Sequence, residues 1–208
     1  MWDWTSNQRK IVLIRHGATA SNREHRYLGK TDEELDMVGR MELLAQKENG
    51  RYPNVDYLFV SPMKRCKETA DILYPETPYS EISEWTEMDF GEFEGKNYQE
   101  LSGDQRYQEW IDSGGILPFP GGESREAFVE RCAHGFEMMW NVLEPLQQGQ
   151  LTVGCIVHGG TIMALLSRFH GGEYFDYQVP NGGIYWWIPS GSAVGGSILA
   201  AASDPSDR

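Results

Sequence analysis

The stretch Ile11-Val12-Leu13-Ile14-Arg15-His16-Gly17 places a cation, an imidazole and a glycine directly after four apolar residues. A short apolar run bounded by polar residues is typical of a buried β-strand. Ligands of α/β proteins bind beyond the carboxyl ends of the strands, and a glycine lets a ligand approach the backbone. An isolated Arg-His-Gly is more often a surface turn, so the rest of the chain decides whether these residues form a site.

The same arrangement returns late in the chain. Residues 151–157 (Leu-Thr-Val-Gly-Cys-Ile-Val) are predicted to form a second buried strand, which is followed by His158-Gly159-Gly160 and an apolar helix over 161–169. Parallel strands of one sheet present their ligands at the same edge. The two histidines are therefore expected to lie at one edge of a sheet.

A third predicted strand, over residues 55–60, leads into Ser61-Pro62-Met63-Lys64-Arg65. Proline is favoured at the first position of a helix, so a helix is expected over 62–73, with Arg65 in its first turn. Arginine matches phosphate oxygens bidentately, and the N-terminus of a helix adds N–H donors. Two arginines and two histidines that meet at this edge would form a cavity for a small dianion.

Strands and helices alternate along the chain, which favours a parallel sheet covered by helices on both faces. A helix is expected over 35–48, with Asp36 as its N-cap and Met41, Leu44 and Ala45 on one face. The remaining predicted helices are 98–101, 104–113 and 123–146, and the last strands are 183–189 and 193–200. The prediction is a three-layer α/β/α sandwich whose mostly parallel sheet carries an antiparallel edge strand.

A length of 208 residues suits one sizeable core. Residues 1–208 are therefore predicted to form a single domain, with an ordered insertion at about 74–122 that covers the site. Disordered linkers contain few aromatic residues, whereas this segment contains many of them: Trp85, Phe90, Phe93, Tyr98, Tyr107, Trp110 and Phe119.

Composition limits the partners. The 18 basic and 31 acidic side chains give a net charge of −13, which disfavours nucleic acid and anionic membranes because both bind cationic faces. The N-terminus does not resemble a signal peptide, no apolar run is long enough to span a membrane, and a cytoplasmic location is expected. Cys66, Cys132 and Cys155 are predicted to be reduced core thiols, because their spacing suits neither a disulfide framework nor a zinc site.

Four motifs in order resemble one family: residues 15–22 (Arg-His-Gly-Ala-Thr-Ala-Ser-Asn), 61–70 (Ser-Pro-Met-Lys-Arg-Cys-Lys-Glu-Thr-Ala), 87–95 (Glu-Met-Asp-Phe-Gly-Glu-Phe-Glu-Gly) and His158-Gly159. From about residue 10 to about 188, the chain resembles the histidine phosphatase superfamily, in the branch with phosphoglycerate mutases and small phosphatases. Residues 87–95 and Pro120-Gly121-Gly122-Glu123-Ser124 look most like α-ribazole phosphatases and general-purpose phosphatases.

The resemblance implies that His16 is the nucleophile and carries the phosphoryl group as a phosphohistidine; the residues alone do not separate His16 from His158. Arg15 and Arg65 are expected to hold the phosphoryl oxygens in the transition state. Three further donors to those oxygens are expected: the side chains of His158 and Asn22, and the backbone N–H of Gly159 near a helix start.

A carboxylic acid is expected to protonate the leaving group, and Glu84, Glu87, Asp89, Glu92 and Glu94 are candidates. The match to the family pattern selects Glu87, which would also activate the water in the second half-reaction. For Glu92 and Glu94, a solvated face is the more typical interpretation.

The remaining histidines suggest ordinary roles: His25 in a solvated loop, His134 within a helix and His170 at a helix end. No spacing of histidines and carboxylates indicates a metal site, and neither a metal nor another cofactor is expected.

The predicted activity is that of a metal-independent phosphomonoesterase for a small phosphorylated metabolite. The aromatic-rich insertion would suit a ring-bearing ester, such as α-ribazole 5'-phosphate in cobalamin assembly. The alternatives are a broad-specificity or sugar-phosphate phosphatase, a phosphoglycerate mutase, which is an isomerase, and a binding module without turnover. The sequence makes no prediction of oligomeric state.

Overall fold

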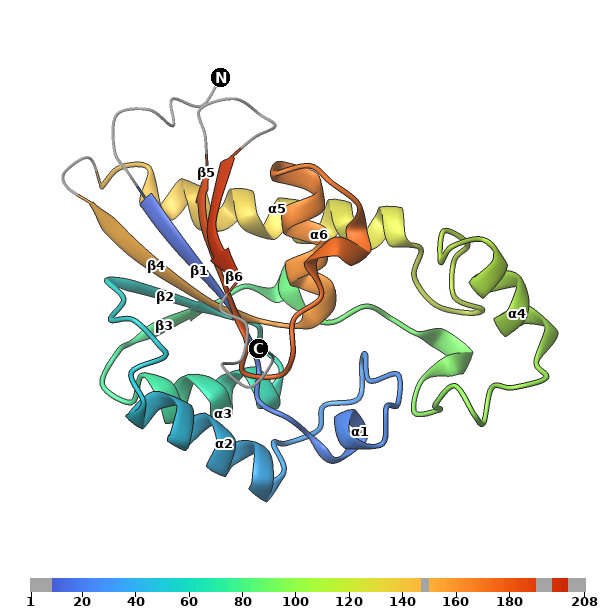
Figure 1. Cartoon of the computed structure of the whole chain (residues 1–208). Coiled ribbons are helices and arrows are strands. Elements are labelled where there is room, and N and C mark those ends of the chain that lie inside the picture. The colour runs from blue at the N-terminus through green and yellow to red at the C-terminus, as the bar shows by residue number, and fades with distance from the viewer. Residues whose placement is uncertain (1–8, 147–149, 190–195, 202–208) are drawn as a thin grey trace.

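The computed structural model describes residues 9–146, 150–189 and 196–201. Six strands form one sheet in the order β3-β2-β4-β1-β5-β6 (Figure 1). Their bounds are β1 (Arg9–Arg15), β2 (Tyr57–Val60), β3 (Tyr79–Glu81), β4 (Leu151–Val157), β5 (Ile184–Pro189) and β6 (Gly196–Ala201). β1 to β4 pair in parallel, and β5 and β6 are added antiparallel beyond β1. The predicted antiparallel edge is confirmed.

Helices cover both faces of the sheet (Figure 1). The longer helices are α2 (Met37–Glu48), α3 (Lys64–Leu73), α5 (Arg125–Leu143) and α6 (Gly159–Phe169), and the shorter ones are α1 (Ala20–Arg23) and α4 (Gln105–Asp112). There are also 3-10 turns over Ser83–Trp85, Gly91–Phe93 and Tyr174–Tyr177. The three-layer α/β/α architecture is confirmed.

The side chains of β1 alternate between the two helical layers. Ile11 and Leu13 pack in the core that α5 and α6 contribute to, and Val12 and Ile14 pack in the core of α2 and α3. All four are fully buried. Burial on both faces explains why the strand is a continuous apolar run rather than an alternating one.

The cap of α2 is as predicted, but its buried face is not. The Asp36 carboxylate accepts a hydrogen bond from the Gly39 N–H at the N-terminus of this helix. Met41 and Leu44 are 62% and 46% exposed, whereas Leu43 is buried. The predicted face was wrong because Gly39 sets the orientation of the helix: a Cβ there would lie 2.3 Å from the Ala18 carbonyl oxygen, so the helix packs closely on the segment after β1.

Other differences concern short or polar segments. The helix predicted over 98–101 was wrong, because these residues form turns. The short strand β3 and the short helix α1 were not predicted, because neither shows an apolar pattern. Helix α1 begins instead at a capping box formed by Thr19 and Asn22. The expected start of the last strand at 193–195 lies outside the described residues.

The 3-10 turn over Ser83–Trp85 is fixed to α5 by Trp85, which is fully buried. Its indole N–H donates to the Cys132 carbonyl at 3.2 Å. A Cβ at Gly135 would lie 2.7 Å from the indole nitrogen, so glycine leaves the notch on α5 that the ring occupies. Further along, aromatic rings pack around Tyr27 with centroids 5.1 to 6.4 Å away: Phe90, Phe93, Tyr107, Trp110 and Phe119.

The three cysteines are buried and unpaired, in agreement with the predicted core thiols. Among the described residues, no helix is long and apolar enough to cross a membrane.

We predict that Gly135→Ala destabilises the protein by about 1–3 kcal/mol, because the methyl group would displace the Trp85 indole. At an exposed helical site the same change would stabilise by up to about 1 kcal/mol. Urea unfolding measures the difference. Asn141→Ala, at an exposed position of the same helix, is the control and should change stability by less than about 0.5 kcal/mol. A Gly135→Ala protein as stable as the wild type would show that Trp85 does not fill this notch.

Candidate active site

The two predicted histidines meet at the carboxyl ends of β1 and β4. Arg15 pairs with Val157 in the parallel register of these strands, so His16 and His158 follow at neighbouring positions. Their ring centroids are 5.1 Å apart, with an angle of 67° between the ring planes. Both side chains are buried, at 3% and 0% exposure.

His16 is held as a neutral ring with a defined orientation. Its Nδ1 lies 2.7 Å from its neighbour's carbonyl oxygen, that of Gly17; since a carbonyl only accepts, Nδ1 carries the hydrogen and Nε2 keeps its lone pair. Burial lowers the pKa of His16 well below its ordinary value, and the charges of Arg65 and Arg15 lower it further. An uncharged imidazole with a free Nε2 is a nucleophile.

His158 is held in the other tautomer. The Arg65 Nε–H donates to its Nδ1 at 3.3 Å, so the hydrogen lies on Nε2, which donates to the Ser61 hydroxyl at 2.8 Å. Burial, and then the Arg65 charge, lower the pKa of His158 well below its ordinary value. The sequence places Ser61 only in the motif before the helix, because its contact with His158 depends on the pairing of β2 with β4.

Arg65 lies in the first turn of α3, as predicted, and its side chain is fully buried. Its two Nη atoms donate to the carbonyls of Thr31 and Gly29, at 2.9 and 3.1 Å. Those two residues are in turn held by Glu94, whose carboxylate accepts from both backbone N–H groups. The prediction that Glu94 is a solvated side chain was wrong: it holds the loop that binds Arg65.

Arg15 keeps guanidinium N–H donors that are free to bind a ligand. One Nη donates to the Val179 carbonyl at 2.7 Å, while the buried Nε has no partner among the described residues. Gly159 is adjacent, since a Cβ there would lie 3.3 Å from that Nε. Gly159 and Gly160 are the first residues of α6, so N–H groups of the helix start lie beside this guanidinium.

Asn22 belongs to the same cluster through Asn181, which no sequence motif marks. The amide group of Asn181 donates to the carbonyls of His16 and Gly17 and to Asn22 Oδ1, the last at 3.0 Å. This contact orients Asn22 so that its own amide N–H groups remain available. Asn181 precedes two glycines before a strand, a pattern that by itself indicates only a turn.

Glu87 reaches the cluster from the segment that crosses α5. Its carboxylate accepts from the backbone N–H groups of Met88 at 2.9 Å and Gly160 at 3.4 Å. A Cβ at position 160 would lie 2.3 Å from Glu87 Oε1, so this close approach requires glycine. Desolvation raises the pKa of Glu87, although the hydrogen bond from Met88 and the charges of Arg65 and Arg15 oppose the rise. A raised pKa suits a carboxyl group that donates a proton near neutral pH.

The other carboxylates of this stretch lie elsewhere. Glu92 is exposed and pairs with Arg106, as expected of a solvated residue. Asp89 pairs with Lys30, and the pKa of Asp89 lies below its ordinary value despite desolvation because of this pair.

The remaining histidines have the ordinary positions that were predicted. His25 is exposed in a turn, His134 is exposed on α5, and His170 is the C-cap residue of α6. Within the described ranges, no group of three or more metal-ligating side chains is present.

A pocket of about 580 Å³ opens beside the cluster. Arg15, Glu87, Gly159 and Gly160 line it on the side of the cluster, whereas the two buried imidazoles lie outside its lining. The rest of the wall is largely apolar and aromatic: Tyr27, Met88, Phe90, Trp110, Phe119, Met163, Tyr174, Phe175, Val179 and Pro180. Arg125 is a second cation of the wall, with its guanidinium 5.0 Å from the Tyr174 ring.

Two histidines, two arginines and a carboxyl group of raised pKa thus share one strand edge, and the sequence profile of the histidine phosphatase superfamily (branch 1) matches residues 11–191. The chain belongs to the histidine phosphatase superfamily.

Superfamily relatives differ in their reactions. The chain is 31% identical over 168 residues to the uncharacterized phosphatase PhoE of Bacillus subtilis, with 78% of each chain covered. It is 26% identical to the 2,3-bisphosphoglycerate-dependent phosphoglycerate mutase of Blochmanniella pennsylvanica, with 83% of this chain and 90% of that protein covered. The α-ribazole phosphatase structure from Shigella flexneri shares the fold, with a TM-score of 0.74, 21% identity, and 90% and 98% coverage. Membership and the phosphatase relatives together support a phosphatase enzyme.

We predict that Arg15→Lys weakens the binding of inorganic phosphate by about 10- to 100-fold, because one or two charge-assisted hydrogen bonds of the guanidinium are lost. Titration calorimetry measures the dissociation constant. Arg168→Lys, on the exposed side of α6, is the matched control and should bind as the wild type does. Equal affinities for all three proteins would place the anion site away from Arg15.

Proposed function

We propose that this superfamily member is a phosphomonoesterase that transfers the phosphoryl group of a small ester first to His16 and then to water. The observation that carries the proposal is the state of His16: a neutral ring, fixed through Nδ1 by the Gly17 carbonyl, beside two arginines. An imidazole in this state attacks through its free Nε2.

In the first half-reaction, the lone pair of His16 Nε2 attacks phosphorus and the bond from phosphorus to the ester oxygen breaks. The Glu87 carboxyl group gives its proton to the departing oxygen. Arg15, the Gly159 N–H and the amide group of Asn22 contact the non-bridging oxygens, and the Nε2–H of His158 does so in exchange for its hydrogen bond to the Ser61 hydroxyl. Arg65 adds positive charge close to both imidazoles and fixes the tautomer of His158. Donors fixed before the reaction stabilise charge in the transition state without reorganisation.

In the second half-reaction, the Glu87 carboxylate removes a proton from water. The water oxygen attacks phosphorus, the bond from phosphorus to His16 Nε2 breaks, and phosphate leaves. Glu87 is then protonated again, so the ester and one water molecule have given an alcohol and phosphate.

The reaction is proposed to need no metal ion. In many phosphatases a metal ion offsets the charge of the transferring group; here the Arg15 and Arg65 guanidinium groups would do so. Three unpaired buried thiols also accord with a reducing compartment such as the cytoplasm.

The pocket supports a ring-bearing leaving group as the substrate class. Its wall is dominated by aromatic and apolar side chains, which bind an apolar ring better than a heavily hydroxylated sugar. In this proposal, residues 74–122 are an insertion that covers the site within one domain. A nucleoside-like ester such as α-ribazole 5'-phosphate fits this class, and a phosphatase of that name shares the fold. A broad-specificity or sugar-phosphate phosphatase is the alternative.

We predict that His16→Ala lowers turnover below about a hundredth of the wild-type rate, which is about 2.7 kcal/mol of barrier. Phosphate release from phenyl phosphate is measured in the presence of EDTA, and wild-type enzyme quenched after a labelled ester is analysed for an acid-labile, base-stable adduct on His16. His134→Ala, at an exposed histidine of α5, is the control and should keep full activity.

Four results would contradict the proposal. Retained turnover in His16→Ala would exclude the nucleophile. Loss of wild-type activity in EDTA, restored by zinc or magnesium, would exclude metal independence. Isomerisation of phosphoglycerate with no phosphate release would identify a mutase, and binding without either reaction would identify a binding module.

We predict that Glu87→Gln separates esters by the acidity of their leaving groups. If Glu87 protonates the departing oxygen, phosphorylation of His16 by an alkyl phosphate should slow by roughly 10²–10⁴-fold. Phosphorylation by p-nitrophenyl phosphate should change little, because its phenolate leaves without a proton. Loss of the base in the second half-reaction should then appear as a burst of nitrophenol followed by slow turnover. Equal losses on both esters without a burst would contradict the role of Glu87 and direct attention to Asp89.

A further inference from the structure

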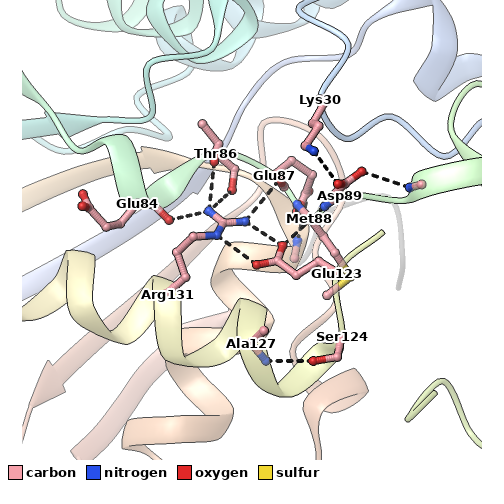
Figure 2. Close-up of polar contacts among 12 residues, drawn as sticks. Lys30, Glu84, Thr86, Glu87, Met88, Asp89, Glu123, Ser124, Ala127 and Arg131 are labelled. Carbon is pink, nitrogen blue, oxygen red and sulfur yellow. Dashed lines mark hydrogen bonds and ion pairs between the residues drawn. The ribbon is translucent and has the colours of Figure 1, made fainter. Parts of the chain in front are cut away.

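The segment that carries Glu87 is held by a half-buried arginine of α5, Arg131, that the proposed reaction does not use. Arg131 points from this helix toward the backbone of residues 84–87 (Figure 2). One Nη donates to the carbonyls of Glu84 at 2.7 Å and Thr86 at 3.0 Å, and to the Thr86 hydroxyl at 2.9 Å. The other Nη lies 3.4 Å from the carbonyl oxygen of Glu87 itself.

The opposite side of the same guanidinium is occupied by Glu123. Arg131 Nε donates to one carboxylate oxygen at 3.0 Å and the second Nη donates to the other at 2.8 Å, a bidentate pair. The Glu123 side chain is 16% exposed. Protein acceptors therefore use every nitrogen of the Arg131 guanidinium, so this group has no role as a substrate-binding cation.

Glu123 also extends the contact to the residues after Glu87. Its carboxylate accepts from the Asp89 N–H at 3.4 Å, and its own N–H donates to the Asp89 carbonyl at 2.9 Å. Asp89 pairs with Lys30 and accepts from the Gly91 N–H (Figure 2). The backbone on both sides of Glu87 is thus tied to one pair of side chains, Arg131 and Glu123.

Such a clamp is needed because residues 86–90 form no helix or strand. An irregular segment has backbone freedom that costs about 1–2 kcal/mol per residue to remove, and a proton donor misplaced by about 1 Å can lose about 100-fold in rate. The Glu87 carboxylate must also stay against the Gly160 N–H of α6. Arg131 fixes the backbone from α5 while the carboxylate is fixed from α6.

We propose that Arg131, held by Glu123, is a positioning residue that sets the Glu87 carboxyl group for proton transfer. This inference rests on the proposed role of Glu87. Because the guanidinium acts through the backbone of the acid, its loss should affect the step that needs the acid and spare steps that do not.

The experiment measures the first-turnover rate of His16 phosphorylation with an alkyl phosphate and with p-nitrophenyl phosphate. Arg131→Met should slow the alkyl ester by about 10- to 100-fold and p-nitrophenyl phosphate by less than about 3-fold, with KM unchanged within about 3-fold. Arg131→Lys keeps the charge but loses the fork, so it should retain most of the defect. Arg168→Met removes another arginine that pairs with a carboxylate of α5 and should show no separation of the two esters.

A double-mutant cycle identifies the route of the effect. In a Glu87→Gln background, Arg131→Met should cause no further separation of the two esters, because the proton donor is already absent. If Arg131→Met does not fold, Glu123→Gln replaces it, since this change weakens the same clamp and leaves the arginine in place. Circular dichroism and thermal unfolding establish that each variant is folded.

The outcomes distinguish a failure of the proposed clamp from a failure of the proposed acid. Equal losses on both esters, or a full effect in the Glu87→Gln background, would overturn the clamp and leave Arg131 a general structural residue. If Glu87→Gln itself does not separate the esters, the proposed acid is wrong, and that failure is visible without any Arg131 variant.

Discussion

The parallel pairing of β1 with β4 is the constraint on which the site depends. Its register sets Arg15 opposite Val157, so the next residue of each strand is a histidine, and the two rings lie 5.1 Å apart. A shift of one residue would reverse the faces of all following side chains. The register is fixed by β1 itself, because its four central side chains are fully buried in two different cores and cannot exchange faces.

Burial and, after it, the charge of Arg65 keep both histidines of this edge uncharged. An unpaired buried cation is strongly unfavourable, and here backbone carbonyls of Gly29 and Thr31 solvate it instead of a carboxylate. Its positive charge therefore adds to the effect of burial and lowers the pKa of both histidines further. Glu94, the acidic residue that holds this loop, binds the loop's N–H groups, so it leaves the guanidinium to the carbonyls.

The sequence predicted those parts of the fold and the site that depend on local pattern. Apolar runs that end in histidine identified β1 and β4, and the proline before Arg65 identified the start of α3 within two residues. The contacts of Glu94, Ser61 and Asn181 were not predictable in this way, because each joins segments that are distant in sequence. The orientation of α2 failed for a related reason: Gly39 packs on Ala18, a tertiary contact that overrides the apolar spacing of Met41 and Leu44.

The position of Glu87 shows how the two helices on one face of the sheet cooperate. The Trp85 indole packs against α5 at Gly135, and Arg131 of α5 donates to the carbonyls of residues 84 and 86. Helix α5 therefore determines where the backbone of Glu87 lies. The Gly160 N–H, in the first turn of α6, determines where the Glu87 carboxylate lies. Since α6 begins directly after His158, any movement of β4 carries both the second histidine and the N–H that receives the acid. The first turn of α6 thus fixes the position of the Glu87 carboxylate relative to the imidazoles. It does so although Glu87 belongs to a segment without regular secondary structure.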